Sequence, residues 1–296
     1  LRASCEGARV ALVSATPSLE SWVNAEAGRY ERIDLPERFG VATLPRLAAV
    51  DLRAEGPEAG RWIAPPLIRA VSERIEAGEQ ALLFLNRRGY APLTVCRACG
   101  HFFECPDCDA RLVTHRFRRA LLCHQCGRSE PLPSACPKCG EGDRLAVSGP
   151  GVERIAEEAA ALWPEARIAV LSSDMALSHA ALRAHVAEIA EGGADIVIGT
   201  QLVAKGHNFP LLTLVGVIDA DLGLQNGDLR AAERTFQLIR QVSGRAGRAE
   251  RPGLALIQTA APDHPVMRAI LAGDEEGFLR REAAARREAG APPFGR

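Results

Sequence analysis

The chain has 296 residues, 47% of them apolar, which is enough for about two domains with buried cores and excludes general disorder. Its longest apolar runs fall far short of the roughly 18 residues that a membrane-spanning helix needs, so no membrane span is predicted. The 36 basic and 37 acidic residues give a formal charge of −1, so any nucleic-acid partner has to be held by local clusters of charge.

Outside one cysteine-rich segment, short β-rich runs alternate with amphipathic stretches along the chain. The runs predicted as strands are 10–13, 81–85, 168–171, 195–198, 213–218 and 254–258. The stretches predicted as helices are 66–77, 152–162, 177–191 and 229–243. This alternation is typical of an α/β fold in which helices cover both faces of a parallel sheet, and a RecA-like lobe is the natural candidate.

The same pattern divides the chain into predicted units. They are the end of a first lobe (1–23), a linker between lobes (24–62), a second lobe (63–95 and 147–260), a cysteine-rich insertion (96–146) and a helical stub (261–296). The linker is assigned because prolines and glycines recur along it and its apolar residues follow neither a helical nor a strand period. In the stub, a charged stretch at 275–288 predicts a solvated helix that leads to a further domain. Since Leu1 is neither an initiator methionine nor the start of a signal peptide, we expect an internal piece of a longer cytoplasmic protein.

Eight of the nine cysteines fall within 44 residues as four C-x2-C pairs. The pairs are Cys96/Cys99, Cys105/Cys108, Cys123/Cys126 and Cys136/Cys139. Such a spacing points two thiolates at one tetrahedral ion, so the four pairs predict two zinc sites with four thiolates each. Iron in a rubredoxin-like site and a redox dithiol are the alternatives.

The stretch between the inner pairs bears on how the pairs combine. Residues 111–115 and 120–123 look like two short strands joined by a basic turn, a hairpin that would bring the second pair onto the third. Nested pairing is therefore favoured, with the outer pairs sharing the second ion, and consecutive pairing stays open. Two zinc ions on eight thiolates add a charge of about −4, so the insertion is not expected to bind phosphate groups strongly. Only the hairpin tip, 116–119, combines local positive charge with an aromatic ring.

Three polar segments are hard to explain by packing alone. Residues 14–18 (SATPS) and 199–207 (GTQLVAKGH) each follow a predicted strand, and α/β proteins bind ligands at the carboxyl ends of their strands. Residues 241–248 (QVSGRAGR) end a predicted helix, on which Arg245 and Arg248 would share a face. The fixed fork of arginine suits a γ-phosphate. Helix capping by the hydroxyl residues and a salt-bridged surface helix are the simpler interpretations.

In combination, these segments resemble motifs III, V and VI of superfamily 2 helicases. With four cysteine pairs inside the second lobe, the resemblance narrows to the PriA family of bacterial primosomal, replication restart helicases. It also includes 84–91 (FLNRRGYA), 149–154, 208–210, 228–240 and 262–265, and so covers nearly the whole chain. The resemblance implies the nested pairing, with Cys96, Cys99, Cys136 and Cys139 on one zinc ion and the inner four cysteines on the other.

The resemblance implies an ATP-dependent 3′ to 5′ DNA helicase that recognises stalled or recombined forks and initiates primosome assembly. Arg245 and Arg248 would act on ATP from the second lobe, and the cofactor cleft would be lined by Gln241, Gly244 and Gly206. On the DNA side, Thr200 would hold a phosphate, while Ser14 and Thr16 would couple hydrolysis to lobe closure. The implied cofactors are ATP, Mg²⁺ and two Zn²⁺, and the implied partners are single-stranded and forked DNA, primosome proteins and single-stranded DNA-binding protein.

Two helicase motifs are absent from this sequence. A Walker A loop needs lysine followed by serine or threonine, whereas the only lysines, Lys138 and Lys205, precede Cys139 and Gly206. The DEEG run at 274–277 lacks the preceding strand and the histidine of a DExH box. We therefore expect both motifs upstream of Leu1 and no ATP hydrolysis by the chain alone. The alternative hypotheses are a non-enzymatic zinc-ribbon scaffold that binds DNA or protein through a degenerate lobe and, more weakly, a redox-sensing module.

Overall fold

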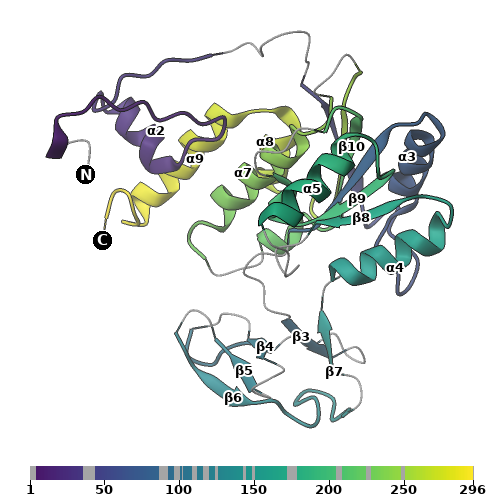
Figure 1. Ribbon diagram of the computed structural model, residues 1–296. Helices are drawn as coiled ribbons and strands as arrows, with labels where there is room; N and C mark the ends of the chain where they lie inside the picture. The colour runs from purple at the N-terminus through teal and green to yellow at the C-terminus, as the bar shows by residue number, and fades with distance from the viewer. Residues whose placement is uncertain are drawn as a thin grey trace.

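A parallel sheet forms the body of the protein in the computed structural model (Figure 1). The structure describes residues 5–35, 44–86, 93–96, 101, 103–108, 112–115, 120–123, 126–142, 145–148, 151–171, 179–204, 209–224, 228–247 and 251–295. In chain order, the strands of this sheet are β1 (Arg46–Asp51), β2 (Gln80–Phe84), β8 (Ile168–Leu171), β9 (Ile196–Gly199), β10 (Leu212–Val217) and β11 (Leu254–Thr259). They lie in the order β1-β11-β10-β2-β9-β8, and every neighbouring pair is parallel.

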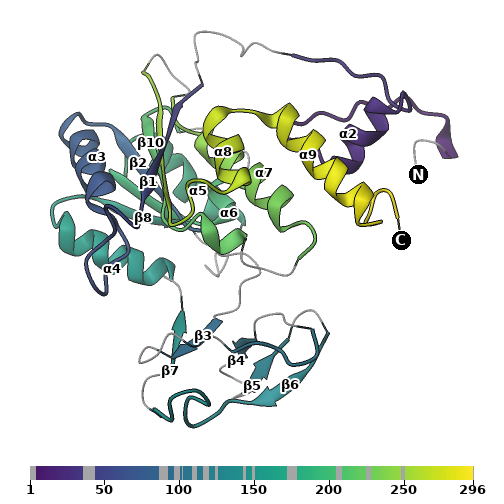
Figure 2. The same cartoon turned by 180° about the vertical axis from the view of Figure 1, so that it is seen from behind.

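Helices cover both faces of this sheet, as Figures 1 and 2 show. One face carries α3 (Pro65–Glu76) and α4 (Val152–Leu162), and the other carries α5 (His179–Ala190), α7 (Ala231–Ser243) and α8 (Pro265–Ala272). Helices α9 (Glu275–Glu288) and α2 (Leu19–Glu26) pack against each other on the outer side of α7 and α8. Central strand β2 is buried along its whole length because its side chains alternate between the two cores: Leu82 and Phe84 enter one, Ala81 and Leu83 the other. The predicted α/β fold class is confirmed.

A second, antiparallel sheet is inserted between β2 and α4. Its strands lie in the order β6-β5-β4-β3-β7. They are β3 (Leu93–Cys96), β4 (Val113–His115), β5 (Ala120–Leu122), β6 (Ser129–Pro131) and β7 (Leu145–Ser148). The chain leaves the lobe through β3 and returns through β7, which pair with each other from Leu93↔Ser148 to Cys96↔Leu145. Figure 1 shows this sheet set apart from the parallel one.

Three elements differ from the sequence-based expectations. Residues 10–13 form no strand, and Val10, Leu12 and Val13 are exposed, because no strand among the described residues pairs with them. The predicted linker 24–62 contains β1, which pairs with β11 residue by residue from Arg46↔Leu254 to Asp51↔Thr259. The local sequence of β1 gives little indication of a strand, because β1 forms by pairing with a strand that is distant in the chain.

The predicted solvated helix, α9, in fact buries one face against the body of the protein. Phe278, Leu279 and Ala283 belong to the core beneath α7 and α8. The Phe278 ring stacks on Phe236 of α7, with 4.2 Å between centroids and 3° between planes. Among the described residues, no helix combines the length and apolar character needed to cross a membrane.

Candidate functional site

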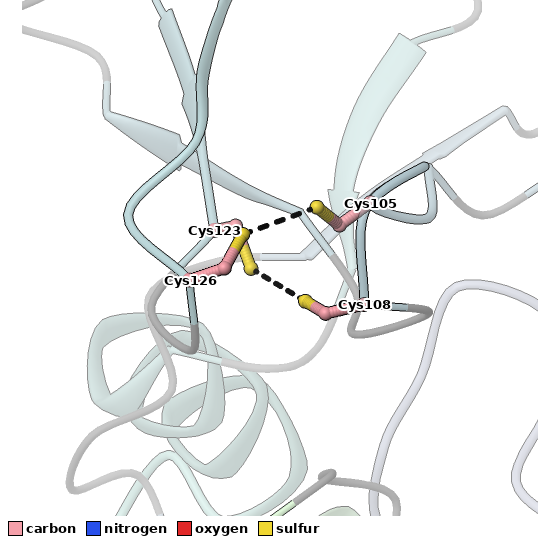
Figure 3. Close-up of side chains that lie close together, drawn as sticks. All are labelled: Cys105, Cys108, Cys123 and Cys126. Carbon is pink, nitrogen blue, oxygen red and sulfur yellow. Dashed lines mark hydrogen bonds between the residues drawn. The ribbon is translucent and has the colours of Figure 1, made fainter.

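Four cysteines of the inserted sheet converge on one point (Figure 3). The Sγ atoms of Cys105 and Cys126 are 3.6 Å apart, and those of Cys108 and Cys123 are 3.4 Å apart. All four Sγ atoms lie within 4.8 Å of one another. The predicted β4–β5 hairpin, with His115 opposite Ala120, brings the two pairs together. The nested combination of the inner pairs is thereby confirmed, and consecutive pairing is wrong for these four residues.

The sulfur positions fit a tetrahedral metal ion. Four thiolates about 2.3 Å from a zinc ion are about 3.8 Å from one another, and the sulfur separations here lie near that value. A set of four thiolates without a carboxylate or imidazole suits structural zinc. Cys105 and Cys123 are buried, whereas Cys126 is exposed, so the centre lies at the edge of the small core formed by Phe103, Leu112 and Leu121.

The outer cysteine pairs are described only in part. The Cys136 turn repeats the Cys123 turn: each first cysteine accepts a hydrogen bond from a later glycine, Gly127 or Gly140, at 3.0 and 2.8 Å. Both glycines have a positive φ, 81° and 78°. Cys96 ends β3, but its side chain and the whole of Cys99 lie outside the described residues. The second predicted zinc site therefore stays a prediction, supported by the repeated turn.

Arg128, which the sequence reasoning missed, connects the turn at Cys123–Cys126 to the turn at Cys105–Cys108. Arg128 donates from Nη1 to Asp107, between Cys105 and Cys108, at 2.7 Å. It donates from Nε to Glu130 on β6, also at 2.7 Å. These hydrogen bonds raise the pKa of Arg128, with Asp107 the larger contributor. The C-x2-C-G-R sequence gives no sign of this contact, because Asp107 lies 21 residues away.

The predicted DNA-contact threonine, Thr200, directly follows β9 at the carboxyl edge of the parallel sheet. It is 5% exposed, and its backbone N–H donates to the carbonyl of Leu171 at 3.2 Å. Its Oγ1 is buried without a hydrogen-bond partner among the described residues. A buried hydroxyl of this kind normally has a partner, so this atom is a candidate ligand contact.

Three of the residues predicted to meet ATP, Gln241, Gly244 and Arg245, lie at the opposite edge of the sheet. Helix α7 ends at Ser243, so Arg245 lies in the following turn rather than on the helix face predicted for it, because the chain leaves the helix at Gly244. Arg245 is 8% exposed and donates its N–H to the Val242 carbonyl at 2.9 Å. Gly247 then donates to the carbonyl of Leu212, at the start of β10. Arg248 and Gly206 lie outside the described residues.

The predicted coupling segment lies against α7. Ser14 Oγ accepts a hydrogen bond from the Thr16 N–H at 3.1 Å. Thr16 Oγ1 accepts one from Gln241 Nε2 at 2.8 Å, across 225 positions of sequence. The structure therefore brings together two segments, 14–18 and 241–248, that the sequence reasoning singled out separately.

Two further residues of α7, which the sequence reasoning missed, contact Pro17 of this segment and Leu19 just after it. Gln237 Nε2 donates to the Pro17 carbonyl at 2.9 Å, and Glu233 Oε1 accepts from the Leu19 N–H at 2.9 Å. The available signal was their spacing, because Glu233, Gln237 and Gln241 are four residues apart and share a helix face.

The sequence reasoning also missed Asp219, which follows β10 at the carboxyl edge of the sheet. Burial raises the pKa of Asp219, and its Oδ1 accepts a hydrogen bond from the Leu222 N–H at 3.0 Å.

Comparison with known proteins identifies this combination of sheet, cysteine cluster and polar segments. The family model described as the PriA DNA helicase Cys-rich region (CRR) domain matches residues 105–131. The Replication restart protein PriA of Rickettsia felis is 44% identical over 294 residues, which is 99% of this chain. The proteins of the same name from Bacillus subtilis and Haemophilus influenzae are 42% and 38% identical over 99% and 96% of the chain. The chain belongs to the PriA family.

The chain spans 45%, 36% and 39% of the lengths of these three PriA proteins. Solved structures give weaker matches. S. cerevisiae Dbp5 L327V bound to RNA and ADP BeF3 aligns over 92% of this chain and 49% of its own, with a TM-score of 0.41 and 12% identity. The C-terminal domain of the DEAD-box protein Dbp5 aligns over 79% of this chain and 86% of its own, with a TM-score of 0.36 and 13% identity. The family assignment rests on the PriA relatives alone.

Proposed function

We propose that this chain is part of an ATP-dependent 3′ to 5′ DNA helicase that recognises stalled or recombined replication forks and initiates primosome assembly. The observation that carries the proposal is the similarity to replication restart proteins along nearly the whole chain, from the segment around Thr16 to the last helix. In this proposal, residues 1–23 end a first lobe, 63–95 and 147–260 form the second lobe, and 261–296 lead to a further domain. Primosome proteins and single-stranded DNA-binding protein are the proposed protein partners.

The nucleotide would meet the edge of the sheet at which α7 ends. Arg245 and Arg248 would stabilise the charge that develops on the γ-phosphate, since a guanidinium can donate two parallel hydrogen bonds to phosphate oxygens. Gln241, Gly244 and Gly206 would line the same cleft. The Thr16–Gln241 hydrogen bond supports this arrangement, because it ties the proposed coupling residues Ser14 and Thr16 to the helix that precedes Arg245.

Single-stranded DNA would bind at the opposite edge of the sheet. The buried, unpartnered hydroxyl of Thr200 supports a contact to a phosphate oxygen there. ATP and DNA would thus bind at different edges of one lobe, and α7, which runs between the edges, would connect them.

Zinc would stabilise the inserted sheet at two sites. Cys105, Cys108, Cys123 and Cys126 would hold one ion, and Cys96, Cys99, Cys136 and Cys139 the other. Structural zinc in four-thiolate sites contributes directly to folding. ATP and Mg²⁺ would require a phosphate-binding loop and an acidic motif, neither of which this sequence contains, so the chain alone should not hydrolyse ATP.

Arginine substitution in the longer protein tests the proposed catalytic role. Arg245→Ala or Arg248→Ala should lower DNA-stimulated ATP turnover about a thousandfold, the range seen when a transition-state arginine is removed. The matched control is Arg234→Ala, which removes an exposed arginine of α7 whose ion pair is with Asp228. Turnover and zinc content of the control should match the unmodified protein. Unchanged turnover in the Arg245 and Arg248 variants would overturn the proposed roles. DNA binding without ATP turnover in the unmodified protein would instead support the scaffold hypothesis.

A further inference from the structure

One face of α7 forms a continuous row of polar contacts with the segment that precedes α2 and with the first residue of α2. The row consists of Gln241 with the Thr16 hydroxyl, Gln237 with the Pro17 carbonyl and Glu233 with the Leu19 N–H, at 2.8, 2.9 and 2.9 Å. The three α7 residues span about 12 Å of helix at 1.5 Å per residue. An extended chain covers about 10 Å over the three steps from residue 16 to residue 19. The two segments therefore match in length.

Of the three contacts in this row, the one between Glu233 and the Leu19 N–H involves a charged side chain. Leu19 is the first residue of α2, and the N–H groups at the start of a helix have no partner within the helix. A carboxylate there satisfies one N–H and interacts favourably with the helix dipole. Ser18, the N-cap residue, accepts the N–H of Ser21. Glu233 therefore supplements the local cap from 214 positions away in the sequence.

Helix α9 neutralises this carboxylate from the other side. Arg286 Nη2 donates to Glu233 Oε2 at 2.8 Å, and Arg286 Nε donates to Glu282 at 2.9 Å. Glu233 and Arg286 are 2% and 5% exposed. A buried charge that loses its partner is costly, so Glu233 depends on both the Leu19 N–H and Arg286. Figures 1 and 2 show α2 alongside α9, as this shared contact requires.

We propose that Glu233 is a positioning residue, which docks the start of α2 and thereby the Ser14–Ser18 segment on α7, and that Arg286 of α9 holds Glu233 in place. The coupling role rests on the proposed function, because it assumes that Ser14 and Thr16 link ATP hydrolysis to lobe closure. Glu233 lies in the first turn of α7 and Gln241 in its last, so the docked segment follows the helix from the carboxyl edge of the sheet toward Arg245. Helix α9 thus takes part in the proposed coupling.

Hydrogen exchange on this chain tests the docking independently of any activity. Glu233→Gln keeps the shape of the side chain but removes the charge between Leu19 and Arg286. Amides at the start of α2 should exchange about tenfold faster, while those of β2 and β10 keep their protection. Glu282→Gln is the matched control, because Glu282 also pairs with Arg286 but does not contact the segment. Equal exchange at α2 in the unmodified and Glu233→Gln chains would overturn the docking.

Kinetics of the longer protein test the coupling. Glu233→Gln should lower kcat for DNA-stimulated ATP turnover about tenfold and leave KM for ATP within about twofold, because Glu233 acts through the segment and not on the nucleotide. The double substitution Glu233→Gln and Arg286→Gln removes both charges and should recover part of kcat. A kcat for Glu233→Gln equal to that of Glu282→Gln would overturn the coupling role. Absence of turnover in the unmodified protein would overturn the proposed function and the coupling with it, while hydrogen exchange would still decide the docking.

Discussion

The ion pair of Asp195 and Arg167 lies just before strands β9 and β8, and it makes the stability of the fold depend on pH. Arg167 donates to Asp195 from Nη2 at 2.6 Å, from Nε at 3.1 Å and from its backbone N–H at 2.8 Å. Side-chain hydrogen bonding from Arg167 lowers the pKa of Asp195, and partial burial opposes this only in part. A lowered pKa in the folded state means that the folded protein binds the proton less tightly than the unfolded chain does.

Asp195→Asn is therefore expected to lower the free energy of unfolding at neutral pH. The loss should be less than about 1 kcal/mol, because the pair faces water. The contribution of Asp195 is complete above its unfolded pKa, near 3.9, and disappears as the pH falls through its lower folded pKa. Urea unfolding of the two proteins from pH 7 to the acid limit checks this: the difference should be constant down to about pH 5 and then shrink. A difference that grows on acidification would contradict the assignment.

At the scale of single residues, the sequence revealed those contacts whose partners share a short stretch of chain. Cys105, Cys108, Cys123 and Cys126 were readable because a two-residue gap fixes how two thiolates point, and a short hairpin joins the pairs. Gln241 was singled out as a residue of the predicted ATP cleft, whereas Glu233 was not singled out at all. The partner of Glu233, Leu19, is 214 positions away, and a glutamate on an amphipathic helix is ordinarily exposed.

The loop after α7 depends on a glycine at position 247. Its φ is +70°, and a Cβ there would lie 2.5 Å from the backbone nitrogen of Gly253 and 2.8 Å from its Cα. Gly273, which ends α8, provides a control, because its φ is +67° and the nearest atom to its Cβ position is 4.0 Å away. The two sites share the cost of a left-handed conformation and differ in the space available.

Gly273→Ala should therefore cost about 1 kcal/mol of unfolding free energy, the strain of a left-handed residue with a side chain. Gly247→Ala should cost clearly more, about 2–4 kcal/mol, since the loop that carries Arg245 must also move away from Gly253. Denaturant unfolding of both variants measures the difference. Equal losses of unfolding free energy would show that the short distance from position 247 to Gly253 adds nothing to the cost of a side chain there.

At the scale of elements, strands and helices with a strong local period were predicted to within about two residues, a typical margin for boundaries. Strand β1, whose local period is weak, was not predicted, and the strand predicted at 10–13 does not form. β1 forms because β11 offers it a continuous row of partners, from Leu254 to Thr259. Helix α9 was expected to be solvated because charged residues dominate it; it packs through Phe278 and Leu279, and its buried Arg286 is neutralised by partners that the local sequence pattern does not show.

At the scale of the whole molecule, the two sheets differ in how they are stabilised. The parallel sheet has a large core on each face. Among the described residues, the inserted sheet has a core of five buried residues, of which Cys105 and Cys123 are metal-ligand candidates. A core of this size gives little hydrophobic stabilisation, and small domains of this kind usually depend on metal or disulfides. The α/β lobe was predicted from the alternation of strands and helices, and the insertion from the position of the cysteine pairs within it. The packing of α2 against α9 depends on contacts between segments that are far apart in the chain.

Removal of zinc is consequently expected to unfold the insertion and leave the lobe folded. After chelation, amides of β4, β5 and β6 should lose protection from hydrogen exchange, because metal binding and folding are coupled in such sites. Amides of β2, β9 and β10 should keep theirs, since no described cysteine of the four pairs belongs to their cores. Cys123→Ser should reproduce the effect and lower the zinc content by about one ion per chain. Cys5→Ser, at an exposed cysteine outside the cluster, is the control and should change neither measurement. If β2 and β10 lost protection together with β5, the insertion and the lobe would be one cooperative unit.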